Sequence, residues 1–387
     1  MCTFQSVKKT LKKINPLIRN YVIGLIVTQG RKNCAAMARA MRIPEKYLSS
    51  FLECFSFTID DIKKTLIELG KYHAAEKSLK AYPCDPTHIL KPYAKCIENL
   101  CYDRAGTTKR TERCLVPIYA AVVDKFATIP QAMKFWMQEK LTGRRHYKSK
   151  VKLTIELITE AIRNKVQFDF VPLDGGFSAP EMFDFFDVQK VSFVMKAARN
   201  RCITTPDGVR AQLKNHPALK LHRNERAKVV KAKFNDGRTY IFVAYKRKDK
   251  DGFCETVYLI SNMDKTAKEL IEAYDMRWPL EKVIRTTKQK FGAMQCQALA
   301  KEKQEAHLLA GFLAYAILEI TNIDKESQSV DELVNEIRQY YFDDLIRLIE
   351  NPFKKAVATG KHSAAKPIQN HVYKKSIKHD SVAHFNA

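Results

Sequence analysis

One acid, one phenol and two cations share the spacing of a single helix face in the last third of the chain. Tyr274, Arg277, Glu281 and Lys288 follow one another at gaps of three, four and seven residues. At 3.6 residues per turn, these gaps keep all four within an arc of roughly 60°. A carboxylate can hold a metal ion and flanking cations can hold phosphates, as phosphodiester chemistry requires. The spacing fits an amphipathic surface helix equally well, so other features must separate the two interpretations.

Asp174 is a second candidate carboxylate. It follows the apolar segment 166–173 and precedes two glycines and Phe177. Ligands in α/β sheets gather at the carboxyl ends of strands, and glycines let a backbone or ligand come close. An Asp-Gly turn is also an ordinary way to leave a strand, so Asp174 gains weight only in combination with Glu281.

The composition favours a polyanionic partner and a metal held by carboxylates. The chain has 67 Lys and Arg against 42 acids, a formal charge of +25. An excess of this size usually indicates nucleic-acid binding. The ten cysteines contain no C-x-x-C and the ten histidines no H-x-x-x-H, which argues against zinc.

No segment is predicted to enter a membrane. The longest apolar run, 308–318, has 11 residues, too few to span a bilayer. The basic amino terminus is not followed by the long apolar region of a signal peptide. We therefore expect a cytoplasmic protein, associated with the nucleoid, without a membrane partner.

The first part of the chain, residues 1–90, is predicted to be a helical DNA-binding region. Residues 33–52 have the pattern of a helix-turn-helix, with small residues in the first helix and a proline turn before the second. Arg42 and Lys46 are the candidate DNA contacts there. Any two helices joined by a proline turn would give a similar pattern.

Residues 91–196 change to an α/β pattern. Apolar and alternating runs predict strands at 96–103, 114–123, 131–137, 166–173 and 191–196. Helices are predicted at 149–164 and 179–186. This order indicates a mixed sheet with flanking helices.

Residues 197–263 are predicted to form a basic, all-β insertion. Strands are expected at 228–234, 239–245 and 255–261, with an Asn-Asp-Gly hairpin turn at 235–237. Residues 196–250 hold 16 Lys or Arg against four acids.

Helices are predicted again after the insertion. They cover 264–277, 279–291 and 304–350, and Pro279 marks a new helix or a kink. That break weakens the one-face argument for Tyr274 and Arg277. The core is expected to resume over 264–320, and 321–387 to hold C-terminal helices and a loose basic tail from 353 onward.

The combined pattern resembles the DDE transposases of the RNase H-like superfamily. Tyr274, Arg277, Glu281 and Lys288 match the Y-x2-R-x3-E-x6-K signature of the insertion-sequence-four family at every gap. Asp174, followed by glycines and an aromatic, resembles the second-aspartate motif of that family. The resemblance spans roughly residues 30–320 and includes a β insertion before the Glu.

The first aspartate is where the sequence departs from this family, which usually has Asp-Thr at the end of the first strand. We assign it to Asp103, which ends a predicted strand but is followed by Arg104. Asp124 is the alternative, although its surroundings favour a hairpin turn. If neither fits, the protein is a decayed or repurposed copy.

The resemblance implies a divalent-metal site and a DNA substrate. Asp103, Asp174 and Glu281 would be catalytic and would hold two Mg²⁺ or Mn²⁺ ions. Double-stranded DNA would be cut at transposon ends, and the freed 3′ hydroxyl would attack target DNA, with a homodimer pairing two ends. The residues expected to contact DNA near the site are Tyr274, Arg277, Trp278, Arg285 and Lys288. The rival interpretations are a catalytically inactive DNA-binding descendant of a transposase and a stand-alone nuclease of the same fold.

Overall fold

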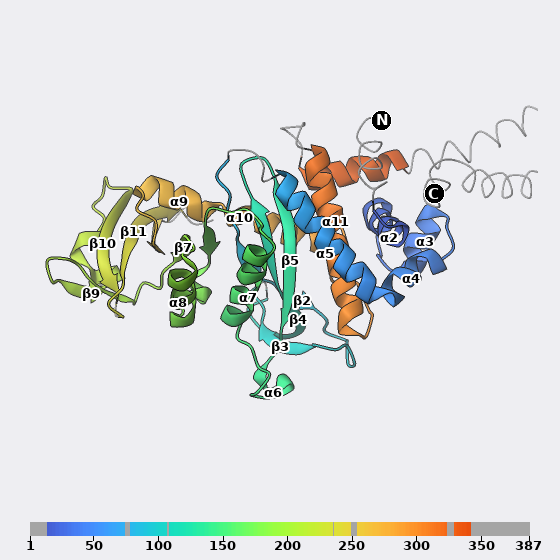
Figure 1. Ribbon diagram of the computed structural model, residues 1–387, viewed down its shortest axis with the longest axis horizontal. Helices are drawn as coiled ribbons and strands as arrows, with labels where there is room; N and C mark the ends of the chain where they lie inside the picture. Colours follow the sequence, from blue (N-terminus) through green and yellow to red (C-terminus); the bar gives the residue numbers. More distant parts are fainter. Residues whose placement is uncertain are drawn as a thin grey trace, which may run out of the picture.

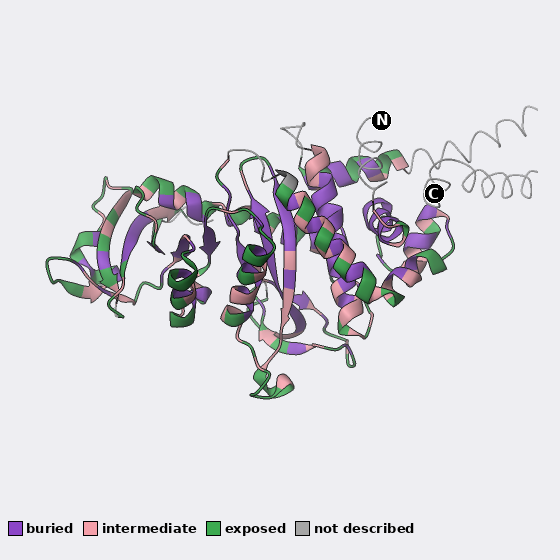
Figure 2. Cartoon of the chain, in the orientation of Figure 1, coloured by how far each residue is buried: buried purple, intermediate pink, exposed green. Residues whose placement is uncertain are grey.

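The computed structural model describes residues 14–73, 78–106, 108–234, 236–248, 254–322 and 329–341. The molecule is elongated, with a helical end, a central sheet and a β-rich lobe at the other end (Figure 1). Buried residues concentrate along the central sheet and the long helix beside it (Figure 2). No described helix is long and apolar enough to cross a membrane.

The N-terminal region is helical as far as residue 73. Its helices are α2 (Pro16–Val27), α3 (Cys34–Met41), α4 (Lys46–Glu53) and α5 (Phe55–His73). The Asn33 side chain caps α3 by accepting from the backbone N–H of Ala36, and Arg42 ends α3 in the left-handed conformation (φ 56°). The helix–turn–helix geometry predicted for 33–52 is therefore present. The prediction of helix up to residue 90 is wrong, because residues 84–86 and 89–90 are strands.

The central sheet is built around one long strand. Its members are β1 (Cys84–Pro86), β2 (Ile89–Leu90), β3 (Cys101–Arg104), β4 (Thr111–Val123) and β5 (Thr128–Trp136). β4 pairs antiparallel with β1 and β2 along one edge and with β3 and β5 along the other. The strand expected at 96–103 is thus confined to its last residues.

Two parallel strands extend the central sheet. β6 (Val171–Leu173) pairs parallel with β7 (Phe193–Lys196). A parallel bridge between Ala81 and Phe170 joins β6 to the segment that leads into β1. The neighbours therefore run β5, β4, β1, β6, β7, which is the mixed sheet predicted from the sequence.

Antiparallel strands continue beyond β7. They are β8 (Cys202–Thr204), β9 (Arg210–Gln212), β10 (Ala227–Phe234), β11 (Thr239–Lys248) and β12 (Cys254–Ser261), in the order β7-β12-β11-β10-β8-β9. The three strands predicted here are confirmed. Gly237 takes the left-handed φ (86°) that the turn between β10 and β11 needs, while Asn235 lies outside the described residues.

Helices cover both faces of the central sheet. α7 (Lys150–Arg163) and α8 (Pro180–Gln189) share one core with Ile118, Ala120 and Val122 of β4. Ser149 caps α7, so this helix begins where the sequence predicted. A short helix, α6 (Glu139–Thr142), precedes it.

The opposite face is covered by helices from both ends of the chain. α5, α10 (Trp278–Gln289) and α11 (Lys301–Asn322) share the second core with Tyr119, Ala121 and Val123. α9 (Ala267–Asp275) precedes α10, and residues 330–341 are helical. The basic tail expected from residue 353 lies outside the described residues. The two alternating faces of β4 thus carry two separate cores.

Candidate active site

The structure brings Asp85, which sequence reasoning missed, to the end of a central strand. Asp85 lies on β1 opposite Tyr119 of β4. On the other side, Ala81 pairs with Phe170 in parallel, and continuing this register for four residues sets Asp85 level with Asp174. Two carboxylates therefore leave neighbouring parallel strands at the same edge of the sheet, where α/β folds gather ligands.

Asp174 stands directly after β6. It is exposed and occupies the N-cap position of a short 3-10 helix, Gly175–Phe177. A Cβ on residue 175 would lie 3.2 Å from the backbone oxygen of Lys196. The first glycine after Asp174 thus lets this turn lie close against β7, which is a local reason for its presence.

The break between α9 and α10 places a guanidinium between two acids. Arg277 is the residue before α10, and Pro279 lies in the first turn of that helix. Arg277 Nη1 lies 2.8 Å from Glu281 Oε1 and 3.7 Å from Asp85 Oδ2. Only 7% of the Arg277 side chain is exposed, so this cation is held in a partly desolvated position between the sheet and the helix.

Lys288 lies two turns after Glu281 on α10, and its side chain reaches the residue just beyond β1. Its Nζ donates to Thr87 Oγ1 at 2.6 Å, and Thr87 follows Asp85 by two residues. Burial lowers the pKa of Lys288, and Asp85 opposes that shift. Asp85, Asp174, Arg277, Glu281 and Lys288 are referred to below as the Arg277 cluster.

In the Arg277 cluster the nearby cations do not fully offset the cost of burying the acids, as the pKa of Asp85 indicates. Burial raises the pKa of Asp85 to about 7; Arg277 opposes the rise, whereas Glu281 and Asp174 add to it. Burial acts to lower the pKa of Arg277, but Asp85 and the other nearby acids outweigh it and raise the value. Three carboxylates thus face two cations in a partly desolvated place, which favours the uptake of a further cation.

Tyr274 and Trp278 flank the cluster at the helix break. Burial raises the pKa of Tyr274 to about 12. Trp278 is 39% exposed, and the guanidiniums of Arg277 and Arg247 lie 5.0 and 5.6 Å from its ring centroid. Trp278 is therefore not a core residue, and its ring lies at the surface between cations.

The donor set of the cluster fits a hard divalent ion. Asp85, Asp174 and Glu281 offer carboxylate oxygens, the ligands that Mg²⁺ prefers. Within the described ranges, no three acidic, His or Cys side chains are drawn together closely enough to form a metal site. The guanidinium of Arg277 instead occupies the place of a counter-cation between Asp85 and Glu281.

Asp103, the residue that the sequence suggested as the first aspartate, does not lie in this cluster. It is opposite Glu112 on β4, seven residues along that strand from Tyr119, or about 23 Å at ~3.3 Å per residue. Its Oδ2 lies 2.5 Å from Lys150 Nζ and 2.9 Å from His88 Nε2. Burial opposes ionisation of Asp103, but these two partners outweigh it and lower its pKa. Asp103 is thus a paired carboxylate that joins β3 to the start of α7.

Asp124, the alternative first aspartate, has a structural role in the hairpin between β4 and β5. Its Oδ1 accepts from the backbone N–H groups of Phe126 and Ala127, both at 2.8 Å. Its Oδ2 accepts from Ser78. These bonds are those of an acid that stabilises a turn.

The remaining predicted DNA contacts are Arg285 on α10 and two residues of the N-terminal helices. Arg285 is exposed on α10, and its Nη2 lies 3.7 Å from Asp331 Oδ2. Lys46 is exposed at the start of α4, and Arg42 is half-buried at the end of α3.

A short signal for Asp85 is present in the sequence. Thr87 follows Asp85 by two residues, and a buried run, 81–84, precedes it. Pro83 lies within this run and Pro86 directly follows Asp85, so the segment lacks the alternating pattern of a strand. The segment becomes a strand because it pairs with β4 and with Phe170 before β6, both of which are distant in the sequence.

The comparison with protein families matches part of the chain. A family model described as "Transposase DDE domain" covers residues 142–317. This range contains Asp174 and the entire 274–288 motif, and it begins after Asp85. The matched region is thus similar to the DDE domain of transposases, and its mixed α/β fold is consistent with that similarity. No curated protein matches the chain.

Proposed function

We propose that this protein is a DNA transposase of the insertion-sequence-four type. It cleaves double-stranded DNA at transposon ends and joins the 3′ hydroxyl to target DNA, with divalent metal ions held by Asp85, Asp174 and Glu281. The observation that carries the proposal is the convergence of three acids from separate elements around Arg277. The +25 charge and the match to the DDE domain support DNA as the substrate.

The three carboxylates are the groups that would hold Mg²⁺ or Mn²⁺. When bound, a pair of such ions activates the attacking oxygen and neutralises charge on the leaving one. Asp85 and Asp174 are fixed by neighbouring strands, whereas Glu281 is carried by α10. Rigid elements therefore supply all three ligands, which favours a reproducible geometry around the scissile phosphate.

The cations of the cluster act as positioning and phosphate-binding groups. Arg277 holds Glu281 toward Asp85, and its planar guanidinium is suited to a phosphate as well as to a carboxylate. Lys288 is directed toward the strand that carries Asp85 by its bond to Thr87. Exposed Trp278 offers a ring face for stacking on a base.

Further regions extend the proposed DNA interface. The α3–α4 helix–turn–helix presents exposed Lys46. The basic β lobe, 197–263, would follow the phosphate backbone. Each site works on one end, so a homodimer that pairs two ends is expected, acting at the nucleoid.

The test of the proposal is Glu281→Gln. Nicking of supercoiled plasmid in Mn²⁺ should fall by at least about 10³-fold, because the variant keeps the side-chain size but loses a metal ligand. Duplex binding measured in EDTA should stay within about threefold of wild type. Retained nicking would show that Glu281 is not a ligand.

An inactive DNA-binding descendant is the second candidate function. It is favoured by the Arg277 guanidinium, which holds the acids around itself rather than around an open metal site. Wild-type protein that binds duplex DNA without nicking it at any Mn²⁺ concentration would establish this alternative. Nicking without joining of cleaved ends to a second DNA would instead indicate a nuclease.

A further inference from the structure

A strongly basic surface lies at the end of the central sheet away from the Arg277 cluster. It is formed by β3, the adjoining end of β4, and α6 with the turn that follows, all at the lower edge of Figure 1. Its defining residues, called the β3–α6 surface below, are Tyr102, Arg104, Arg113, Lys140, Arg144 and Arg145.

The segments of this surface are held together by specific contacts. The backbone N–H of Tyr102 donates to Gln138 Oε1, just before α6. Lys140 Nζ lies 5.9 Å from the Tyr102 ring centroid, so the helix lies against the strand. Lys150, at the start of α7, is anchored on Asp103 of β3. β3 is therefore tied both to α6 and to the start of α7, and Arg144 and Arg145 lie in the segment between these two helices.

Two cations of the β3–α6 surface, Arg113 and Lys140, contact neutral groups. Arg113 Nε donates to the Tyr102 hydroxyl at 2.9 Å, and its Nη1 donates to the Ala94 carbonyl at 2.7 Å. Its guanidinium lies 5.2 Å from the Tyr102 ring centroid. Within the part of the chain that the structure describes, none of the five cations of this surface forms an ion pair. Their charge is therefore not neutralised by acids, and the hydrogen bonds of Arg113 fix the orientation of its guanidinium.

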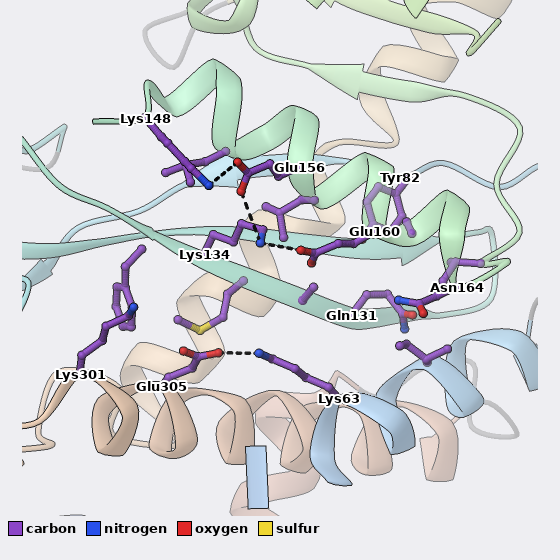
Figure 3. Close-up of a pocket in the computed structure, with 18 residues that line it drawn as sticks. Lys63, Tyr82, Gln131, Lys134, Lys148, Glu156, Glu160, Asn164, Lys301 and Glu305 are labelled. Atoms are coloured by element: carbon purple, nitrogen blue, oxygen red, sulfur yellow. Dashed lines mark hydrogen bonds and ion pairs between the residues drawn. The ribbon is translucent and has the colours of Figure 1, made fainter. Parts of the chain in front are cut away.

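A neighbouring cavity shows how the same chain neutralises its lysines elsewhere. This cavity, of about 390 Å³, lies between α7, β5, α5 and α11 (Figure 3). In it, Lys148 Nζ lies 2.6 Å from Glu156, and Lys134 Nζ lies 2.6 Å from Glu160. Unlike these two lysines, the cations of the β3–α6 surface have no carboxylate partner in the described chain.

We propose that the β3–α6 surface binds the sugar-phosphate backbone of duplex DNA at a distance from the cleaved phosphate. The inference rests on the proposed function only for the identity of that duplex. Two of these cations lie 5.2 and 5.9 Å from the centroid of the exposed Tyr102 ring, and cations without carboxylate partners suit phosphate contacts that do not depend on DNA sequence. The separation of about 23 Å along β4 corresponds to about seven base pairs at ~3.4 Å each.

The test compares two double substitutions in the full-length protein. Arg144→Gln/Arg145→Gln removes two exposed charges from the surface. The control, Arg163→Gln/Lys165→Gln, removes two exposed charges from the other end of α7, and neither forms an ion pair with another residue of the described chain. Both variants should keep the thermal unfolding midpoint of wild type, since all four side chains are exposed.

The readout is duplex affinity as a function of salt, measured in EDTA so that catalysis plays no part. The surface variant should lose roughly tenfold in affinity and about 1.8 in the slope of log K against log salt, at ~0.9 per phosphate contact. The control should change neither. Equal slopes for the two variants would overturn the inference. So would loss of binding to phosphatidylserine vesicles with duplex binding intact, which would indicate a lipid surface instead.

These outcomes are separate from those that test the proposed function. If Glu281→Gln failed to abolish nicking, the proposed function would be wrong, but the expected difference in salt slope between the two double variants would still stand. Equal slopes would leave the role of Glu281 untouched.

Discussion

The Arg277 cluster and the β3–α6 surface use cations in opposite ways. In the cluster, Arg277 is 7% exposed and lies within ion-pairing distance of two acids. On the β3–α6 surface, Arg113 is held by a tyrosine and a backbone carbonyl. Burial with acids organises charge for chemistry, whereas exposure without acids leaves charge available for a polyanion. The excess of Lys and Arg in the composition does not distinguish these uses.

The largest effect that would sharpen this comparison is expected from Arg277. Arg277→Ala leaves Asp85 and Glu281 without their shared cation, so plasmid nicking in Mn²⁺ should fall by about 10²-fold. Arg277→Lys should recover part of that loss, because a single ammonium cannot reproduce the planar guanidinium. Duplex affinity in EDTA is the control readout. An alanine variant as active as wild type would show that the cluster does not depend on this cation.

A smaller effect is expected on the free energy of unfolding, which should change in opposite directions when Asp85 and Asp103 are each replaced by Asn. Burial raises the pKa of Asp85 to about 7, above the ~3.9 of an unfolded chain. The folded protein thus holds this proton more tightly, and the contribution of Asp85 to stability falls as the pH rises from about 4 to about 7. In EDTA at pH 8, Asp85→Asn should be more stable than wild type by about 1–2 kcal/mol, a figure reduced because the side chain keeps 20% of its exposure.

Asp103→Asn provides the matched comparison. The pKa of Asp103 is lowered, so its charged form stabilises the fold, and that contribution is lost as the pH falls through the folded value. This variant should be less stable than wild type by about 1–2 kcal/mol at pH 7. Denaturant unfolding of both variants checks the signs. If both substitutions changed the free energy of unfolding in the same direction, the proposed difference between buried Asp85 and ion-paired Asp103 would be wrong.

The elements around the site were predictable where local signals were strong. Ser149 and the apolar period after it defined α7, and Gly237 marked the hairpin between β10 and β11. The motif from Tyr274 to Lys288 was read correctly as helical with a break, and the break falls at Met276 and Arg277. Local sequence determines caps, turns and helix faces.

The first aspartate could not be placed in the same way. The sequence favours Asp103 because it ends an apolar run, whereas Asp85 lies in a short segment that contains Pro83 and Pro86. That segment becomes a strand through pairing with β4 and with Phe170, about 90 residues away.

The measurement that tests the central claim most directly is Mn²⁺ binding by the full-length protein, followed by electron paramagnetic resonance of the free ion. Wild type and Asp103→Asn should bind alike, whereas Asp85→Asn should bind at least about tenfold more weakly, because only Asp85 lies with Glu281 and Asp174. Weakened binding in Asp103→Asn with wild-type affinity in Asp85→Asn would contradict the account.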